Sequence, residues 1–189
     1  MHRSDGECST CEARTRDQIN NEGYEMKFVS IVMESKSDYS IMSECSETLK
    51  KFGVPYELII SSAHRSSERT VRYVKEAEAK GAQVFIAASG MAAHLAGALA
   101  ASTTKPILGV PMESGALKGE DALLSTVMMT AGMPVGTLAI GESGAVNAAY
   151  LAIQIMALGD DELKVKLQED RISKAKKVEL DSSEIETIL

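Results

Sequence analysis

Apolar and polar positions alternate along residues 27–158 in a pattern that repeats five times. Each repeat opens with a short apolar run, passes through a polar loop and continues into a stretch with helical periodicity. Short apolar runs bounded by loops are typical of buried strands. The five runs are KFVSIVM (27–33), YELIIS (56–61), QVFIAA (83–88), PILGVPM (106–112) and VGTLAI (135–140).

A helix is expected after each run. Gly53 and Gly81 stand where the first two helices should stop, because glycine readily adopts the left-handed conformation that ends a helix. The first expected helix runs from the first loop to Gly53, and the second covers about 68–80. The third ends near Thr103, the fourth ends near Met128, and the fifth covers about 145–158.

Five strand-then-helix repeats predict crossover connections, and hence a parallel sheet with helices on both faces. About 130 residues with five strands is the size of a flavodoxin-like open sheet, not of an eight-stranded barrel. We therefore predict a three-layer α/β/α fold with a five-stranded parallel sheet, in one domain over residues 26–178. This domain includes a C-terminal amphipathic helix at about 160–177, and residues 179–189 are expected to form a tail.

The helix expected at 145–158 is apolar nearly all round. A helix without a polar face is buried on all sides. In so small a domain a second subunit would have to cover an outer helix, so the sequence favours a homo-oligomer.

Composition narrows the possible partners. The formal charge of −7 and the isoelectric point near 5.1 argue against a nucleic-acid or anionic-membrane surface.

No apolar run has the length of a transmembrane helix, and residues 1–25 lack the apolar segment of a secretory signal. Those residues are expected to be a disordered leader or a tag remnant, in which Cys8 and Cys11 are a chance pair rather than half of a zinc site. The three cysteines build no disulfide framework, so we expect a cytoplasmic protein.

Polar residues with possible chemistry gather in the loops that follow the strands. Ligands of open parallel sheets bind beyond the carboxyl ends of the strands. Serines and glycines at helix N-termini supply donors for a phosphate, Arg65 could add a bidentate contact, and Asp38 suits a ribose hydroxyl. A neutral imidazole at His64 could carry a proton near pH 7. The sequence shows no metal cluster and no Walker-type loop.

Each of these residues also has a structural interpretation. Ser35, Ser37 and Asp38 could cap the next helix, and His64 and Arg65 could lie in a solvated turn. Their concentration at one edge of the sheet favours a binding site for a phosphate-bearing small molecule.

At these loops the chain resembles the N5-carboxyaminoimidazole ribonucleotide mutase family, the class I form of phosphoribosylaminoimidazole carboxylase in purine biosynthesis. The resemblance covers residues 27–158 in order and spacing, and rests on SKSD, SAHRSS, GMAAHLAG, GVPMESGALKGEDALLS and MPVGTLAIGESGAVNAAYLAIQIMAL. It implies a flavodoxin-like subunit, an octamer, and a small-molecule ribonucleotide substrate. The implied reaction moves a carboxylate from the exocyclic nitrogen of the imidazole to ring carbon 4 without metal, ATP or organic cofactor.

Carried over by motif, the resemblance makes His64 the general acid and base. Ser35, Ser37 and Arg65 would hold the 5′-phosphate, and Asp38 a ribose hydroxyl. The imidazole and carboxylate pocket would be lined by Ser62, Ala63, Ser89, Gly90, Ala92, Ala93 and His94.

The chain departs from the family pattern at three places. Glu34 stands where the family has glycine, and a carboxylate there would oppose a phosphate dianion. Ala96 stands where the family's H-L-P-G has proline, and Met129-Thr130 stands where the family usually has Met-Pro before the turn into the fifth strand. The orientation of Glu34 stays open at this point.

Three rival functions follow. Class II relatives carboxylate aminoimidazole ribonucleotide directly, but SAHR together with AAHL favours the mutase. A binding-only homologue is possible if Glu34 has ended turnover. A flavin-binding module is disfavoured, because the loops have almost no aromatic rings for a flavin to stack on.

Overall fold

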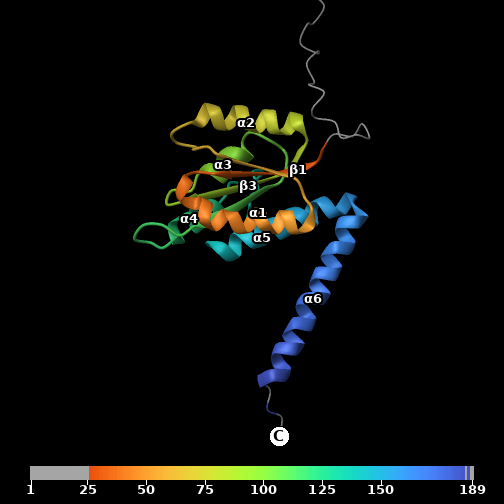
Figure 1. Ribbon diagram of the computed structural model, residues 1–189. Coiled ribbons are helices and arrows are strands. Elements are labelled where there is room, and N and C mark those ends of the chain that lie inside the picture. The colour runs from red at the N-terminus through yellow and green to blue at the C-terminus, as the bar shows by residue number, and fades with distance from the viewer. Residues whose placement is uncertain (1–25, 186, 188–189) are drawn as a thin grey trace, which may run out of the picture.

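The computed structural model describes residues 26–185 and 187, so the leader with Cys8 and Cys11 lies outside the described residues. Strands and helices alternate as expected (Figure 1). The elements are β1 (Phe28–Met33), the 3-10 helix η2 (Lys36–Asp38), α1 (Tyr39–Phe52), β2 (Tyr56–Ile60), α2 (Ser67–Lys80), β3 (Ala82–Gly90), α3 (Leu95–Ala100), β4 (Ile107–Met112), α4 (Glu120–Val127), β5 (Gly136–Thr137), α5 (Glu142–Met156), the 3-10 helix η3 (Ala157–Gly159) and α6 (Asp161–Ile185).

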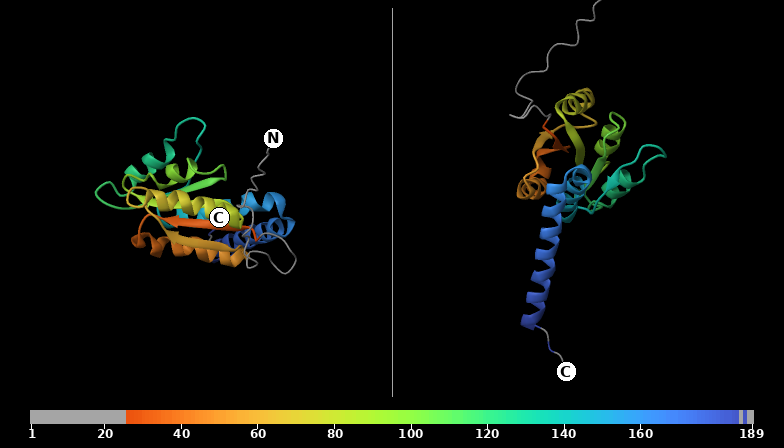
Figure 2. Two further views of the ribbon diagram at one scale, coloured as in Figure 1. Left: turned by 90° about the horizontal axis from the view of Figure 1, so that it is seen from above. Right: turned by 90° about the vertical axis from the view of Figure 1, so that its right-hand side faces the viewer.

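The five strands form one parallel sheet in the order β2-β1-β3-β4-β5. Helices α1 and α5 cover one face and α2 and α3 the other, which confirms the three-layer flavodoxin-like fold (Figures 1 and 2). Side chains of β1 alternate between the two faces: Val29 and Ile31 join the core under α1 and α5, and Phe28 and Val32 join the core under α2 and α3.

Two glycines end helices as predicted. Gly53 after α1 has φ 71° and Gly81 after α2 has φ 110°, and the backbone N–H of each donates to carbonyls of the last helical turn. Other boundaries differ from the prediction. β5 has only two residues: Gly136 and Thr137 pair with β4 at the sheet edge, and beyond them only single backbone bonds, from Leu138 to Gly109 and from Gly141 to Pro111, continue the contact. α3 ends at Ala100, three residues before the expected Thr103.

A buried polar group interrupts the core under α2. The Ser30 side chain is fully buried, and its hydroxyl is 2.8 Å from the Tyr73 hydroxyl. Tyr73 donates in turn to Glu57 at 3.1 Å, and Glu57 pairs with Lys80. Burial raises the pKa of the Tyr73 phenol, so this hydroxyl stays a neutral donor.

Helix α6 extends away from the body of the domain (Figures 1 and 2). It begins near the expected position and continues to Ile185, well past the expected end at 177. Leu163 packs in the core, while Val165 and Ile172 are about half exposed. Residues 178–185 continue the helix because no proline or glycine interrupts them, although the apolar periodicity fades there. Among the described residues, no helix combines the length and apolar character that crossing a membrane requires.

Candidate active site

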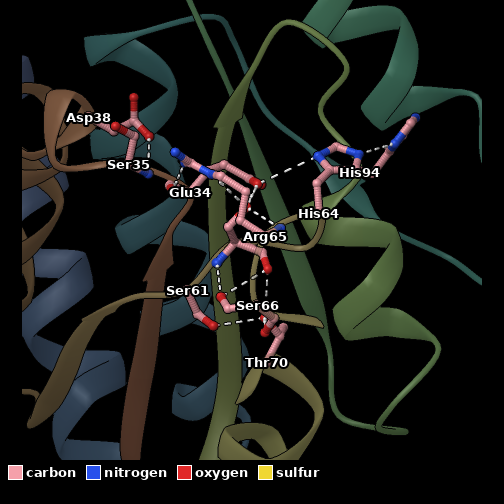
Figure 3. Close-up of polar contacts among 10 residues, drawn as sticks. Glu34, Ser35, Asp38, Ser61, His64, Arg65, Ser66, Thr70 and His94 are labelled. Carbon is pink, nitrogen blue, oxygen red and sulfur yellow. Dashed lines mark hydrogen bonds and ion pairs between the residues drawn. The ribbon is translucent and has the colours of Figure 1, made fainter. Parts of the chain in front are cut away.

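The carboxyl ends of β1, β2 and β3 bring three loops to one edge of the sheet (Figure 3). β1 and β3 are neighbours in the sheet, and the helices that follow them, α1 and α3, lie on opposite faces. A ligand crevice forms at such a reversal of strand order. The predicted site residues in these three loops are Ser35, Ser37, Asp38, Ser62, Ala63, His64, Arg65, Ser89, Gly90, Ala92, Ala93 and His94.

Asp38 organises the loop after β1. Its Oδ2 accepts the backbone N–H of Ser35 at 3.1 Å, and its Oδ1 accepts the Ser37 hydroxyl at 3.3 Å. Ser35 Oγ accepts the backbone N–H of Ser37, which completes a capping box at η2. Asp38 is buried, and burial raises the pKa of its carboxyl. Ser35 and Asp38 therefore cap η2, whereas Asp38 makes no side-chain cap bond to α1, so the structural interpretation holds for these two residues at η2 alone. The exposed Ser37 hydroxyl remains accessible to a ligand.

Serine and threonine hydroxyls build the turn after β2. The backbone N–H of Ser62 donates to Ser66 Oγ at 2.9 Å, and Ser66 Oγ donates back to the Ser62 carbonyl at 3.1 Å. Ser61 and Thr70 share a buried hydrogen bond of 2.8 Å, and Arg65 N–H donates to Ser62 Oγ at 3.1 Å. Sequence reasoning missed Ser66 and Thr70, although their spacing of four residues from Ser62 and Ser66 is the signal for such hydroxyl-to-backbone bonds.

Two histidines from different loops meet at this edge. His64 Nε2 lies 2.7 Å from His94 Nδ1, and the two rings pack edge to face with centroids 4.9 Å apart. His64 follows the half-buried Ala63, and its own side chain is 51% exposed. His94 stands immediately before α3. A proton on one of the two facing nitrogens can therefore pass to the other, and a ligand can reach both rings.

The Glu34 carboxylate points into the site, which answers the question that the sequence left open (Figure 3). Its Oε1 accepts the Ser62 hydroxyl at 2.5 Å and lies 3.7 Å from His64 Nδ1. Its backbone carbonyl accepts Arg65 at 3.3 Å. The side chain is 15% exposed, and Oε2 is buried without a hydrogen-bond partner in the described part of the chain.

The last residues of β3 and the loop after it form the third side. Ser89 and Ala93 are buried, Gly90 is partly buried and Ala92 is exposed. A Cβ on Gly90 would lie 2.5 Å from Ser114 Oγ in the loop after β4, so glycine allows these two loops to approach each other closely.

A separate hollow of about 500 Å³ lies toward the opposite edge of the sheet, lined in part by Lys27, Lys105 and Lys166. No histidine lines it, and it lies at the amino ends of strands, away from the usual ligand crevice. We therefore place the candidate site at the carboxyl edge. Within residues 26–185 no three His, Cys, Asp or Glu side chains converge as a metal site would require.

These features define a flavodoxin-like α/β subunit whose strand-end loops can bind an anionic small molecule and move a proton. A family model described as AIR carboxylase matches residues 28–177 of the chain. The chain belongs to the AIR carboxylase family.

Relatives and solved structures agree with this assignment. The chain is 49% identical over 150 residues to the N5-carboxyaminoimidazole ribonucleotide mutase of Brucella melitensis, covering 79% of this chain and 93% of the relative. It is 49% identical over 143 residues to the protein of the same name from Escherichia coli strain K12, covering 76% and 85%. The crystal structure of Treponema denticola PurE superposes with a TM-score of 0.78 at 28% identity, covering 85% of this chain and 99% of that chain.

Proposed function

We propose that this protein is an N5-carboxyaminoimidazole ribonucleotide mutase. The observation that carries the proposal is the meeting of His64, His94, Ser62 and Arg65 at one sheet edge, in a chain whose relatives with that name are 46–49% identical. The substrate would carry a carboxylate on its exocyclic nitrogen, and the product would carry it on ring carbon 4.

His64 would act as the general acid and base. The N–carboxylate bond breaks, carbon dioxide is released within the site, and protonated His64 gives a proton to the nitrogen. Carbon 4 then attacks the carbon dioxide, and His64 removes the ring proton from that carbon. The net change moves one carboxylate and returns one proton to His64, so the reaction consumes no oxidant, reductant or ATP. The exposed imidazole beside a second histidine supports this role.

The remaining predicted residues would hold the substrate. Ser35, Ser37 and Arg65 would bind the 5′-phosphate, and Asp38 would bind a ribose hydroxyl. Arg65 already reaches across from the second loop to the first, where it donates to the carbonyl of residue 34. The pocket for the imidazole and carboxylate would be lined by Ser62, Ala63, Ser89, Gly90, Ala92, Ala93 and His94.

We also propose a homo-octamer in the cytoplasm. In the single subunit α5 is not buried on all sides: Leu151 and Ile155 are only partly buried and Leu158 just after it is exposed. Apolar surface of this kind is suited to a second copy of the chain. Sedimentation at the mass of eight subunits would support the proposal, and a monomer at micromolar concentration would contradict it.

Turnover can be measured with freshly made N5-carboxyaminoimidazole ribonucleotide, without ATP or added bicarbonate. Formation of the 4-carboxy product well above the spontaneous rate would support the mutase. Product that forms only from aminoimidazole ribonucleotide and added carbon dioxide would instead indicate direct carboxylation. Substrate binding without any product would indicate a binding-only homologue.

The variant His64→Asn tests the proton transfer. We expect turnover to fall by about 10²–10⁴-fold, the usual contribution of a general acid or base. The oligomer should stay intact, because the exposed ring contributes little to packing. Full activity of the variant would refute the role of His64.

A further inference from the structure

Glu34 is in contact with the groups to which the reaction has been assigned. Its Oε1 accepts the Ser62 hydroxyl at 2.5 Å and faces His64 Nδ1 at 3.7 Å. His64 Nε2, on the other side of the same ring, faces His94 Nδ1 at 2.7 Å. We propose that Glu34 is a positioning residue that sets the tautomer of His64. We also propose that the negative charge of Glu34 weakens the binding of the anionic substrate. The kinetic part of this proposal rests on the proposed function.

The carboxylate distinguishes the two neutral tautomers of His64. If Nε2 carried the proton, the lone pair of Nδ1 would face the oxygen of Glu34, which is electrostatically unfavourable. If Nδ1 carries the proton, it faces that oxygen favourably and leaves Nε2 as an acceptor. His94 then donates from Nδ1 to His64 Nε2. The arrangement leaves the base lone pair of His64 on Nε2, away from Glu34.

The surroundings hold the carboxylate in this position. Ser62 Oγ donates to Glu34 and itself accepts the backbone N–H of Arg65 at 3.1 Å. The Arg65 side chain donates to the Glu34 carbonyl at 3.3 Å, so the first two loops are joined at two points. Glu34 therefore acts through Ser62 and His64, which the mechanism places at the substrate.

Burial makes the charge of Glu34 consequential. Oε2 is buried and has no hydrogen-bond partner in the described segment, so part of the carboxylate lacks the hydration that water would give it. Protonation of His64 places a compensating cation beside that carboxylate. A substrate phosphate or carboxylate that enters the site meets the same negative charge, which opposes its binding. The negative charge of Glu34 thus stabilises the His64 imidazolium formed during turnover and destabilises the bound anionic substrate.

The test compares Glu34→Gly, Glu34→Gln and the matched control Glu44→Gln, an exposed glutamate on α1. The first readout is the ¹⁵N chemical shifts of the His64 imidazole at a pH where the ring is neutral, recorded without substrate. The parent protein should show the proton on Nδ1, and Glu34→Gly should show a shift of population toward the tautomer with the proton on Nε2. Glu34→Gln should fall between them, because the partial negative charge of the amide oxygen favours a proton on Nδ1 less strongly than a carboxylate does.

The second readout is the division between kcat and KM. Glu34→Gly should lower KM by about fivefold as the opposing charge is removed, and lower kcat by about tenfold as His64 loses its fixed tautomer. Glu34→Gln should lower KM similarly and keep more of kcat. The control Glu44→Gln should leave kcat, KM and the spectra unchanged.

The outcomes separate this proposal from the proposed function. If the parent enzyme has no mutase activity, the function fails, but the spectra still decide the role of Glu34. An unchanged His64 tautomer in both Glu34 variants would overturn the positioning role. An unchanged KM in both variants of an active enzyme would overturn the effect on binding.

Discussion

Replacing Asp170 by asparagine should loosen the attachment of α6 to the domain. Asp170 Oδ1 accepts Lys51 of α1 at 2.5 Å, and Oδ2 accepts the Tyr150 hydroxyl of α5 at 2.8 Å and lies 3.1 Å from Lys174 Nζ. Its side chain is 8% exposed. One carboxylate therefore joins α6 to the preceding helix α5 and to α1, which is about 120 residues away in the sequence.

The size of this stabilisation follows from the pKa of the Asp170 carboxyl. Burial alone would raise the pKa of Asp170, but the hydrogen bonds from Lys51, Tyr150 and Lys174 outweigh burial and lower it from 3.8 to about 2. That difference corresponds to at most about 2.4 kcal/mol of folding free energy. Lys51 and Lys174 are each 59% exposed, so solvent screening reduces the contribution to about 1–1.5 kcal/mol at neutral pH.

The sign of the pH dependence follows as well. A carboxyl with a lowered pKa stabilises the folded state fully above its unfolded value of 3.8, and this contribution is lost as pH falls through about 2. The difference in unfolding free energy between the parent protein and Asp170→Asn at pH 3 should therefore be about half of the difference at pH 7. It should also shrink in 1 M salt, because the two lysines are exposed.

Urea unfolding at one fixed protein concentration provides the assay, since assembly would otherwise shift the midpoint. Exchange of α6 amides would show whether the loss is local to that helix. Equal stability of the two proteins at pH 7 and low salt would refute the reasoning, and so would a gap of the same size at pH 3.

Two further predictions concern the packing of the sheet. Gly144→Ala should cost about 3 kcal/mol or more, because the added Cβ would overlap the backbone carbonyl of Ala139 and force α5 to move; Gly159→Ala, which has open space, is the control for urea midpoints. Tyr73→Phe should cost about 1–2 kcal/mol, because the fully buried Ser30 hydroxyl loses its partner. An unchanged urea midpoint in the Tyr73 variant would mean that Ser30 finds another partner.

Much of the fold could be predicted from local pattern. The five apolar runs became the five strands, and Gly53 and Gly81 end the helices that they were expected to end. The least accurate predictions were the ends of elements that depend on contacts with neighbouring elements. β5 pairs with β4 through only two residues, and the length of a pairing is not encoded in either strand alone.

The candidate site was only partly predictable. The sequence placed its residues in loops at one edge of a sheet, because parallel strands all end on the same side. It could not decide between capping and binding for Asp38, whose two carboxylate oxygens turn out to accept from its own loop. Hydrogen bonds within a loop depend on backbone torsions that the local sequence leaves open.

The sequence by itself determined the order of elements, the parallel sheet and the set of polar side chains available at its carboxyl edge. These follow from residue spacing and from crossover geometry, which depend on the chain alone. The tertiary structure decided which of those side chains touch. His64 meets His94, and Glu34 turns toward Ser62, because β1, β2 and β3 are adjacent in space while their loops are about 30 residues apart in the chain. Contacts across such separations depend on strand order and packing, which no local pattern specifies.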